Sequence, residues 1–219
     1  MRKFILSMAI CLFALNIFAQ TADSEQLKRD GDKALQTKDY ATAFSKYNEY
    51  LKLTNYQDSV TAFNCGVCAD NTKNYADAAK LFGVAIDKKY NVASAYLGKA
   101  NALKDLKKNT EYIATVKDGL EALPNDQTLE KLYAIYYLKE GQKFQKANNI
   151  IKAEENFKNA ASVSSKKWKT DALYSLGALL YNAKDYKKAV EYLQEATTVS
   201  PERAEIKKLL DGAQAMIKQ

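Results

Sequence analysis

A pattern of small and aromatic residues returns about every 35 residues along the chain, and this period constrains the fold more than any other feature of the sequence. Gly31 and Gly66 are 35 residues apart, and each is followed at the same spacing by a tyrosine and then by an alanine. A period of roughly 30 to 40 residues is typical of solenoids, in which similar helical hairpins stack on one another. We therefore expect a row of similar two-helix units.

The clearest copy of the pattern lies between residues 172 and 201. Gly177 and Ala189 are small enough to let the backbones of two helices approach closely, and Tyr186 fills the turn between these helices. Pro201 ends the second helix and suits the first position of the helix after it. The residues that define this copy are Leu173, Leu176, Gly177, Tyr186, Ala189, Leu193, Ala196 and Pro201.

The same pattern occurs upstream in four further copies. Two regular copies comprise Leu27, Gly31, Tyr40, Ala43, Tyr47 and Tyr50, and then Cys65, Gly66, Tyr75, Ala78, Phe82 and Ala85. A third, degenerate copy comprises Leu97, Gly98, Tyr112, Val116, Gly119 and Pro124, with about two extra residues at the turn 106–109. The fourth comprises Tyr137, Gly141, Phe144, Ile150, Ala153, Phe157 and Ala160, with Ile150 in place of the turn tyrosine.

These spacings resemble the tetratricopeptide repeat over nearly all of the chain after its first segment. The resemblance implies an all-α fold, a right-handed solenoid of about five helix-turn-helix hairpins plus a C-terminal capping helix. The composition agrees, because the chain contains only two prolines and eight glycines. We expect one domain over residues 20–219, with repeats at 24–57, 58–90, 91–124, 125–165 and 168–201 and a cap at 202–218.

The expected helices come from the same pattern. They are 24–37, 41–53, 59–72, 75–88, 91–107, 110–122, 126–148, 150–163, 168–183, 186–199 and 202–218. Helix 126–148 is expected to project about two turns beyond a standard hairpin, at 1.5 Å per residue. We interpret this overhang as a reserve docking surface.

The first residues form a separate segment. Arg2 and Lys3 precede an apolar run of about fifteen residues, an order typical of a secretory signal peptide. The run is shorter than the roughly 20 residues that span a bilayer as a helix. We therefore expect a signal peptide at residues 1–19, cleaved between Ala19 and Gln20, rather than a retained membrane anchor. The mature chain is then expected in the periplasm or cell envelope of a Gram-negative bacterium, without stable membrane insertion.

The chain contains no histidine. This excludes a histidine general base, histidine metal ligands and the Ser-His-Asp and Cys-His arrangements of hydrolases. The sequence also lacks a Gly-rich phosphate loop, a serine nucleophile elbow and an HExxH motif. We therefore expect no enzymatic activity, no cofactor and no metal site.

Cys65 and Cys68 form a CxxC motif, for which three interpretations are open: core packing, a disulfide, or thiol chemistry. Reactive CxxC pairs are activated at the N-terminus of a helix. Here about six helical residues from Ser59 onward should precede Cys65. Core packing is therefore favoured over a thiol-dependent enzyme.

The charge pattern does not indicate a nucleic-acid partner. The formal net charge is +7, but the lysines are spread along the whole chain. After the expected signal peptide the only arginines are Arg29 and Arg203, whereas phosphate and base recognition favours clustered arginine. The excess of positive charge is better explained by solvated helix surfaces.

The resemblance also implies where a partner would bind, because the family lines a concave groove with its first helices. The corresponding residues are Lys28, Phe63, Val67, Ala95, Lys99, Leu138, Gln142, Tyr174, Ala178 and Tyr181. Aromatic and apolar side chains among polar ones suit an extended or helical peptide with apolar anchors. We expect an envelope scaffold or adaptor that binds a partner protein or peptide. The alternatives are a periplasmic chaperone-like client binder and, less favoured, the thiol-dependent enzyme.

Overall fold

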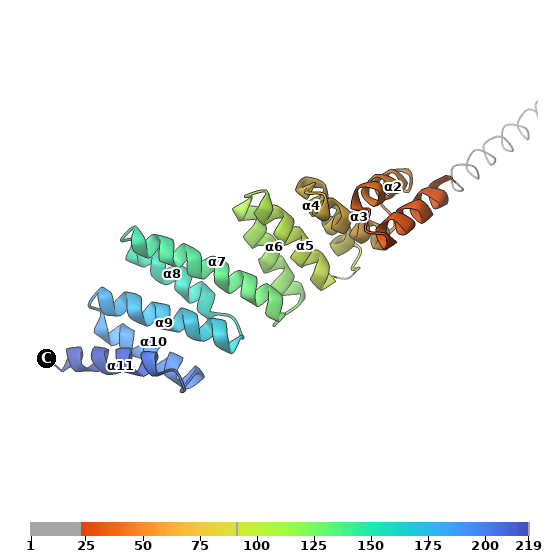
Figure 1. Ribbon diagram of the computed structural model, residues 1–219. Helices are drawn as coiled ribbons and strands as arrows, with labels where there is room; N and C mark the ends of the chain where they lie inside the picture. The colour runs from red at the N-terminus through yellow and green to blue at the C-terminus, as the bar shows by residue number, and fades with distance from the viewer. Residues whose placement is uncertain (1–22, 91, 219) are drawn as a thin grey trace, which may run out of the picture. The chain divides into compact units, whose positions relative to one another are not determined.

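The computed structural model describes residues 23–90 and 92–218, which form helices joined by short turns (Figure 1). No strand occurs within these two ranges. The expected all-α fold of packed helical hairpins is therefore confirmed. The expected signal peptide, residues 1–19, lies outside the described residues. Within the described ranges, no helix combines the length and the apolar content that crossing a membrane requires.

The helices agree with the predicted ones to within two residues at each described end. The described part of the first helix spans residues 23–36. The later helices are α2 (Tyr40–Leu53), α3 (Ser59–Asn71), α4 (Tyr75–Asp87), α5 (Val92–Asp105), α6 (Asn109–Ala122), α7 (Gln127–Lys146), α8 (Ile150–Ala161), α9 (Lys166–Asn182), α10 (Tyr186–Val199) and α11 (Ala204–Ile217).

Several helices begin at an aspartate or asparagine whose side chain accepts a hydrogen bond from a backbone N–H of the first turn. These N-cap residues are Asp39, Asp58, Asp126, Asn149 and Asp185. A helix leaves the N–H groups of its first turn without a partner inside the helix, so each cap satisfies a donor that would otherwise need water. The caps fix where α2, α3, α7, α8 and α10 start.

The first helix of every hairpin is followed, two residues after its last helical residue, by a residue in the left-handed region of backbone conformation. These residues are Lys38, Lys73, Lys107, Asn148 and Lys184, with φ between 57° and 64°. No described glycine has a positive φ. The chain thus places lysine or asparagine at the tight turns and keeps its glycines within helices.

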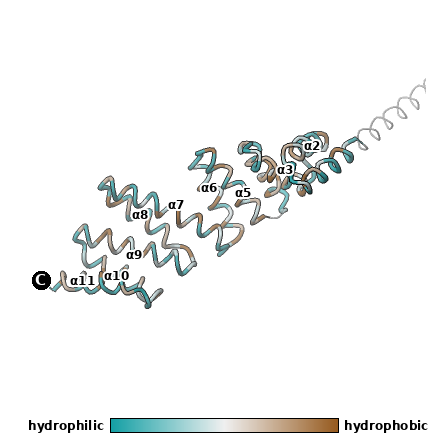
Figure 2. The backbone as a smooth tube through the Cα atoms, viewed as in Figure 1, coloured by the Kyte–Doolittle hydropathy of each residue, from teal (hydrophilic) through white to brown (hydrophobic). Residues whose placement is uncertain are grey.

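The described residues divide between Thr115 and Val116, within α6, into two compact units. In unit 1, which ends at Thr115, α2 packs on α3, α3 on α4 and α4 on α5. In unit 2, which starts at Val116, α7 packs on α8, α8 on α9, α9 on α10 and α10 on α11 (Figure 1). Hydrophobic and hydrophilic residues are mixed along the helices, as expected for helices that bury one face (Figure 2).

Most of the repeat glycines lie where the second helix of the same hairpin presses a large side chain onto the first helix. A Cβ added at Gly31 would lie 2.6 Å from the ring of Tyr47, and one at Gly141 would lie 2.5 Å from the ring of Phe157. Tyr47 and Phe157 are both fully buried. Gly66 faces Phe82 and Gly177 faces Leu193 in the same way. The absence of a side chain therefore lets the two helices approach.

The third hairpin corrects the predicted alignment. A Cβ at Gly98 would meet Phe82 of the preceding hairpin at 2.6 Å, so Gly98 packs against the previous repeat. In the regular hairpins the packing glycine precedes the left-handed turn residue by seven positions, as Gly66 precedes Lys73. Seven positions before Lys107 stands Ala100, which is fully buried. Ala100 thus holds the packing position. The prediction of two extra residues at the turn is wrong, because the turn has the regular length when it is counted from Ala100.

The last helix closes the array as a cap. Ile206 and Ala213 of α11 are fully buried in a core that includes Leu179 and Leu193. The side of α11 that carries Lys207 and Asp211 is exposed. A helix that is apolar toward the preceding hairpin and polar on its other side is what a terminal repeat needs to stay in water.

We predict opposite effects of alanine at two helical glycines. Gly141→Ala should lower the free energy of unfolding by about 1–3 kcal/mol, because the new methyl group overlaps the buried ring of Phe157. Gly83→Ala should raise the free energy of unfolding by up to about 1 kcal/mol, because a Cβ there has no atom within 4 Å and alanine favours helix over glycine. Urea denaturation followed by circular dichroism measures both. Equal stability of Gly141→Ala and the wild type would contradict the packing role of Gly141.

Candidate functional site

Several residues expected in the groove share one position of the repeat, three residues before the packing glycine. They are Lys28, Phe63, Leu138 and Tyr174. In three of these hairpins the structure places this side chain against the residues that start the next first helix. Side chains at this repeat position therefore help to stack one hairpin on the next. The sequence pattern did not predict this role.

Asp58, the N-cap residue of α3, is the polar centre of the first such joint. Lys28 Nζ lies 2.6 Å from Asp58 Oδ2, and Thr61 donates to the carboxylate from its backbone N–H at 3.0 Å and its hydroxyl at 2.8 Å. The Tyr50 hydroxyl donates to Asp58 Oδ2 at 3.2 Å. Burial alone would raise the pKa of Asp58, but the hydrogen bonds from Lys28 and Thr61 outweigh it and lower the pKa to about 2. Lys28 is thus already paired within unit 1.

Phe63 occupies the same position in the second hairpin. Its ring centroid lies 5.6 Å from that of Phe82 and 5.8 Å from that of Tyr90, both in edge-to-face geometry. Tyr90 lies in the turn before α5. Edge-to-face pairs of this kind stabilise packing beyond the area they bury. Much of the Phe63 ring is therefore used inside unit 1.

Tyr174 occupies this position in the last hairpin, and Leu138 occupies it in the hairpin before. The Arg203 guanidinium lies 5.9 Å from the centre of the Tyr174 ring, and it is held there by an ion pair with Asp171 at 2.5 Å. Leu138 packs, partly buried, against the core of unit 2. Both side chains keep some exposed surface.

Ala95 and Lys99 do not lie where they were expected. Ala95 is fully buried, so its side chain has no surface to offer a partner. The cause is the shifted alignment of the third hairpin, since the first-helix positions were counted from Gly98 instead of Ala100. Lys99 lines a pocket of about 510 Å³ formed by α4, α5 and the start of α6.

The remaining groove residues of unit 2 lie together on α7 and α9. Tyr174, Ala178 and Tyr181 succeed one another at helical spacing along one side of α9, which contacts α7. Gln142 is exposed, whereas Ala178 and Tyr181 are half-buried. The Tyr181 ring lies 5.5 Å from that of Tyr186 in edge-to-face geometry. We call Leu138, Gln142, Tyr174, Ala178 and Tyr181 the first-helix face of unit 2. In unit 1, Val67 is half-buried on α3.

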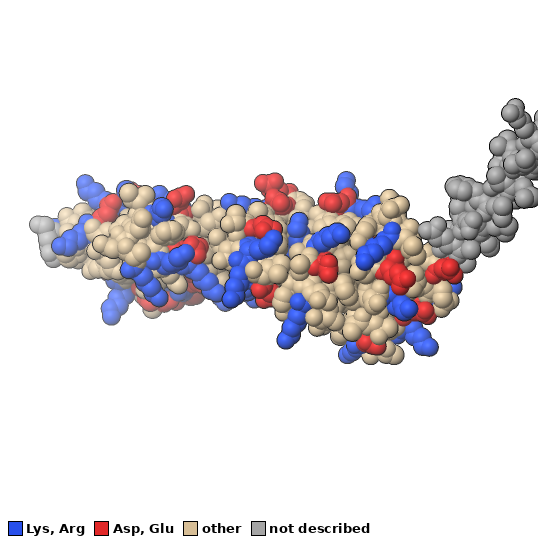
Figure 3. All heavy atoms as spheres, turned by 90° about the horizontal axis from the view of Figure 1, so that it is seen from above, with Lys and Arg blue, Asp and Glu red and all other residues tan. Residues whose placement is uncertain are grey.

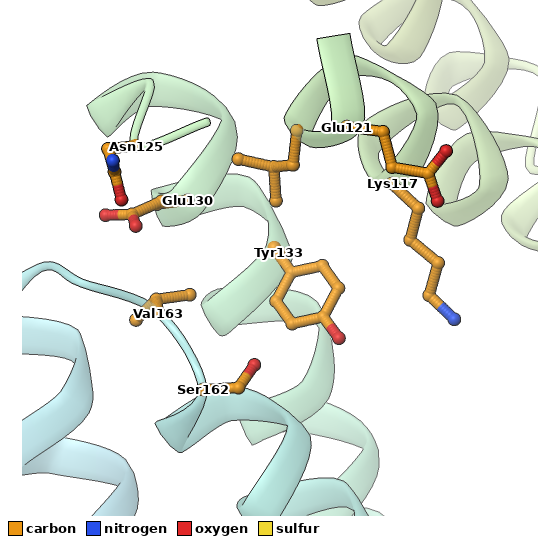
Figure 4. Close-up of a pocket in the computed structure, with 8 residues that line it drawn as sticks. Lys117, Glu121, Asn125, Glu130, Tyr133, Ser162 and Val163 are labelled. Carbon is orange, nitrogen blue, oxygen red and sulfur yellow. The ribbon is translucent and has the colours of Figure 1, made fainter. Parts of the chain in front are cut away.

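A pocket of about 360 Å³ in unit 2 was not predicted (Figure 4). It lies between the end of α6, the start of α7 and the connection from α8 to α9. Its lining residues are Lys117, Leu120, Glu121, Asn125, Glu130, Tyr133, Ser162 and Val163. The expected overhang of the long helix corresponds to the first turns of α7, which this connection partly covers: Leu129 and Glu130 are 1% and 4% exposed. One side of this segment is therefore buried, whereas Gln127, Thr128 and Lys131 remain exposed.

Glu130 explains why those turns of α7 are covered. Its carboxylate accepts hydrogen bonds from the backbone N–H groups of Ser164 at 2.7 Å and Ser165 at 3.0 Å. Ser165 is the N-cap residue of α9, so the carboxylate lies at the positive end of that helix. Glu130 thereby ties α7 to the start of α9.

Three tyrosines and a lysine lie next to this pocket. The Tyr137 ring centroid is 4.7 Å from that of Tyr133 and 5.2 Å from that of Tyr136. Burial raises the pKa of Tyr133 and of Tyr136. Lys117 Nζ lies 5.6 Å from the centre of the Tyr137 ring, and a hydrogen bond to the Tyr137 side chain raises the pKa of Lys117. The sequence signal that could have indicated this cluster is the spacing of Tyr133 and Tyr137, four residues apart on one helix side.

Cys65 and Cys68 are free thiols, and both are fully buried in α3. The Cys65 thiol lies 3.8 Å from the backbone oxygen of Phe44. Burial raises the pKa of Cys68 to about 11 and raises that of Cys65 further. Because the thiolate is the reactive form, neither side chain is prepared for thiol chemistry near neutral pH. Among the described residues, no group of three or more Cys, Asp or Glu side chains could hold a metal ion.

Charged side chains of both signs are interspersed over the face shown in Figure 3. Exposed ion pairs join residues three positions apart at the starts of helices, such as Lys108 with Glu111 at 3.0 Å and Lys188 with Asp185 at 3.3 Å. Exposed pairs of this kind contribute little to stability and serve mainly to keep the surface solvated.

Comparison with known proteins identifies the architecture. A family model described as tetratricopeptide repeat matches residues 170–203. A TPR repeats protein of Bacteroides fragilis, known from a crystal structure, is 56% identical to this chain, and the match covers 89% of this chain and 99% of that one with a TM-score of 0.85. No curated protein matches the chain.

Two more distant solved structures also match most of the chain. MamA is 19% identical over 84% of this chain and 94% of its own, with a TM-score of 0.46. YrrB, described as a TPR protein with an unusual peptide-binding site, is 16% identical over 93% of this chain and 97% of its own, also with a TM-score of 0.46. At this distance neither likeness says anything about the site.

We predict that the Asp58 joint makes stability depend on pH in the acid range. The folded-state pKa of about 2 lies below the unfolded value of roughly 3.9, so the contribution of this carboxylate is complete above about pH 4 and is lost as the pH falls toward 2. Asp58→Ala should lower the free energy of unfolding at pH 7 by about 1–2 kcal/mol, through loss of the cap. Asp58→Asn keeps a capping side chain and should remove mainly the pH-dependent part. Urea titrations between pH 2 and 7 compare the three proteins, and identical pH profiles for wild type and Asp58→Asn would contradict the assignment.

Proposed function

The chain belongs to the tetratricopeptide repeat family, and on that premise we propose that it is an exported scaffold or adaptor that holds a partner protein or peptide in the cell envelope. The family consists in general of protein-interaction scaffolds without enzymatic activity, and its repeats bind protein or peptide partners. The burial of both free thiols in α3 counts against the thiol-dependent alternative.

The first-helix face of unit 2 is the surface that we propose for the partner. Tyr174 and Tyr181 lie on one side of α9 and both are half-buried. In unit 1 the position of Tyr174 is taken by Lys28, which is paired with Asp58, and by Phe63, which is half-buried against two other rings. Tyrosine side chains with an apolar body and a polar tip are enriched among the residues that dominate interface energies. Two partly exposed tyrosines on one side of a single helix are the observation that carries the proposal.

The proposed location rests on the sequence of the first segment. Two basic residues, an apolar run and a small residue before the expected cut are what a signal peptide requires. Fractionation of the producing bacterium and N-terminal sequencing of the purified protein test it. We expect a chain that begins at Gln20 in the periplasmic or envelope fraction. A cytoplasmic chain that still begins at Met1 would contradict export.

Loss of the two tyrosines should weaken partner binding. We predict that Tyr174→Ala together with Tyr181→Ala reduces affinity at least about tenfold, because hot-spot side chains each contribute on the order of 1–2 kcal/mol or more. The partner is first captured from the envelope fraction by crosslinking and identified by mass spectrometry. Its affinity for the variant is then measured by calorimetry.

Tyr192→Ala is the matched control, because it removes a half-buried tyrosine from the second helix of the same hairpin. It should leave affinity unchanged, and circular dichroism should show all variants folded. Unchanged affinity of the folded double variant would rule out the first-helix face. Capture of many weakly held clients instead of one stoichiometric partner would favour the chaperone-like alternative.

A further inference from the structure

The carboxylate of Glu130 is buried without a cationic partner among the described residues. Its side chain lines the pocket shown in Figure 4, and the residue is only 4% exposed. In the part of the chain that the structure describes, no lysine or arginine nitrogen forms an ion pair with it. Glutamate is almost never this deeply buried unless it is paired, because the loss of hydration disfavours its charge. Two backbone N–H groups donate to this carboxylate, one of them from the N-cap residue of α9, and they compensate part of its lost hydration.

The carboxylate retains acceptor capacity toward a ligand. Each of its oxygens accepts one backbone N–H, from Ser164 and from Ser165. An ionised carboxylate offers about four lone-pair sites, so about two remain. A donor that carries a positive charge would use these sites and would form an ion pair with the carboxylate.

The rest of the pocket suits a long basic side chain. Tyr133, Leu120 and Val163 supply an aromatic and apolar wall, against which the methylene groups of lysine or arginine can pack. Glu121 is an exposed carboxylate on the opposite side of the lining, and an aromatic ring attracts a cation that lies over its face (Figure 4). The volume of about 360 Å³ is at the small end of the range for ligand pockets, which fits one or two side chains.

Lys117 is the one cation among the described residues that line this pocket, and the structure shows it occupied elsewhere. Its Nζ atom lies over the Tyr137 ring at 5.6 Å, and its hydrogen bond to the Tyr137 side chain is the first cause of its raised pKa. Lys117 is exposed, so solvent screens its charge. It therefore opposes a cationic ligand only weakly, and its removal should help such a ligand.

We propose that this pocket binds an arginine or lysine side chain of a polypeptide partner, with Glu130 as the countercharge. The site lies at the turns between α6 and α7 and between α8 and α9, and it shares no residue with the first-helix face of unit 2. It does not depend on the function proposed for that face.

The test titrates the isotope-labelled full chain with the blocked tripeptide Gly-Arg-Gly and monitors backbone amide signals by NMR. The amides of Ser164 and Ser165 report on the pocket directly, because both donate to Glu130. We expect these two signals to shift with Gly-Arg-Gly and to stay in place with blocked Gly-Glu-Gly. The Tyr174→Ala, Tyr181→Ala double variant should bind Gly-Arg-Gly as the wild type does, which separates this site from the first-helix face.

Charge variants at exposed positions give the sign of the interaction without disturbing the core. Lys117→Gln and Asn125→Asp should each tighten Gly-Arg-Gly binding about two- to fivefold, and Asn125→Lys should weaken it by a similar factor. Asn125 has φ of 67°, a conformation that lysine already adopts at the hairpin turns, so Asn125→Lys is compatible with the backbone. Absent shifts at Ser164 and Ser165, or variant effects of the opposite sign, would overturn the proposal.

Discussion

In the regular hairpins a glycine of the first helix contacts a large side chain of the second helix. This contact sets the distance between the two helices. Gly31 against Tyr47 and Gly141 against Phe157 are two instances, and in each the ring lies where a Cβ would otherwise be. Because protein interiors are close-packed, a methyl group at such a position displaces a whole ring or a whole helix. The turn has a fixed place relative to this contact. In each regular hairpin a left-handed residue follows the packing glycine by seven positions.

Much of the fold could be predicted because each regular hairpin repeats the same physical solution. The spacing from the packing glycine to the turn and to the small residue of the second helix gave helix bounds close to those observed. The third hairpin was misaligned because Gly98 was taken as the packing residue. Ala100 is also small enough for that role, and Gly98 packs against Phe82 of the preceding hairpin instead. Only the left-handed conformation of Lys107 shows that Ala100, and not Gly98, is the packing residue. A lysine in the sequence does not indicate that conformation.

The candidate site was less predictable, for reasons that depend on side-chain contacts. The position of Lys28, Phe63 and Tyr174 was assigned to a groove by resemblance, yet each of these side chains also contacts the start of the next first helix. How much surface each of them keeps for a partner depends on the side chains that pack against it from the next hairpin, and a sequence pattern does not contain those contacts. Glu130 escaped prediction for the same reason, since its partners are backbone groups more than thirty residues away.

The most direct test of the account is site-specific photocrosslinking in living cells. A photoreactive residue at Gln142, exposed on the first-helix face of unit 2, is compared with one at Glu191, exposed on the second helix of the last hairpin. We predict that Gln142 gives a discrete crosslinked product with one envelope protein and that Glu191 gives none. The same product from both positions, or from Glu191 alone, would contradict the claim that this chain holds its partner through its first helices.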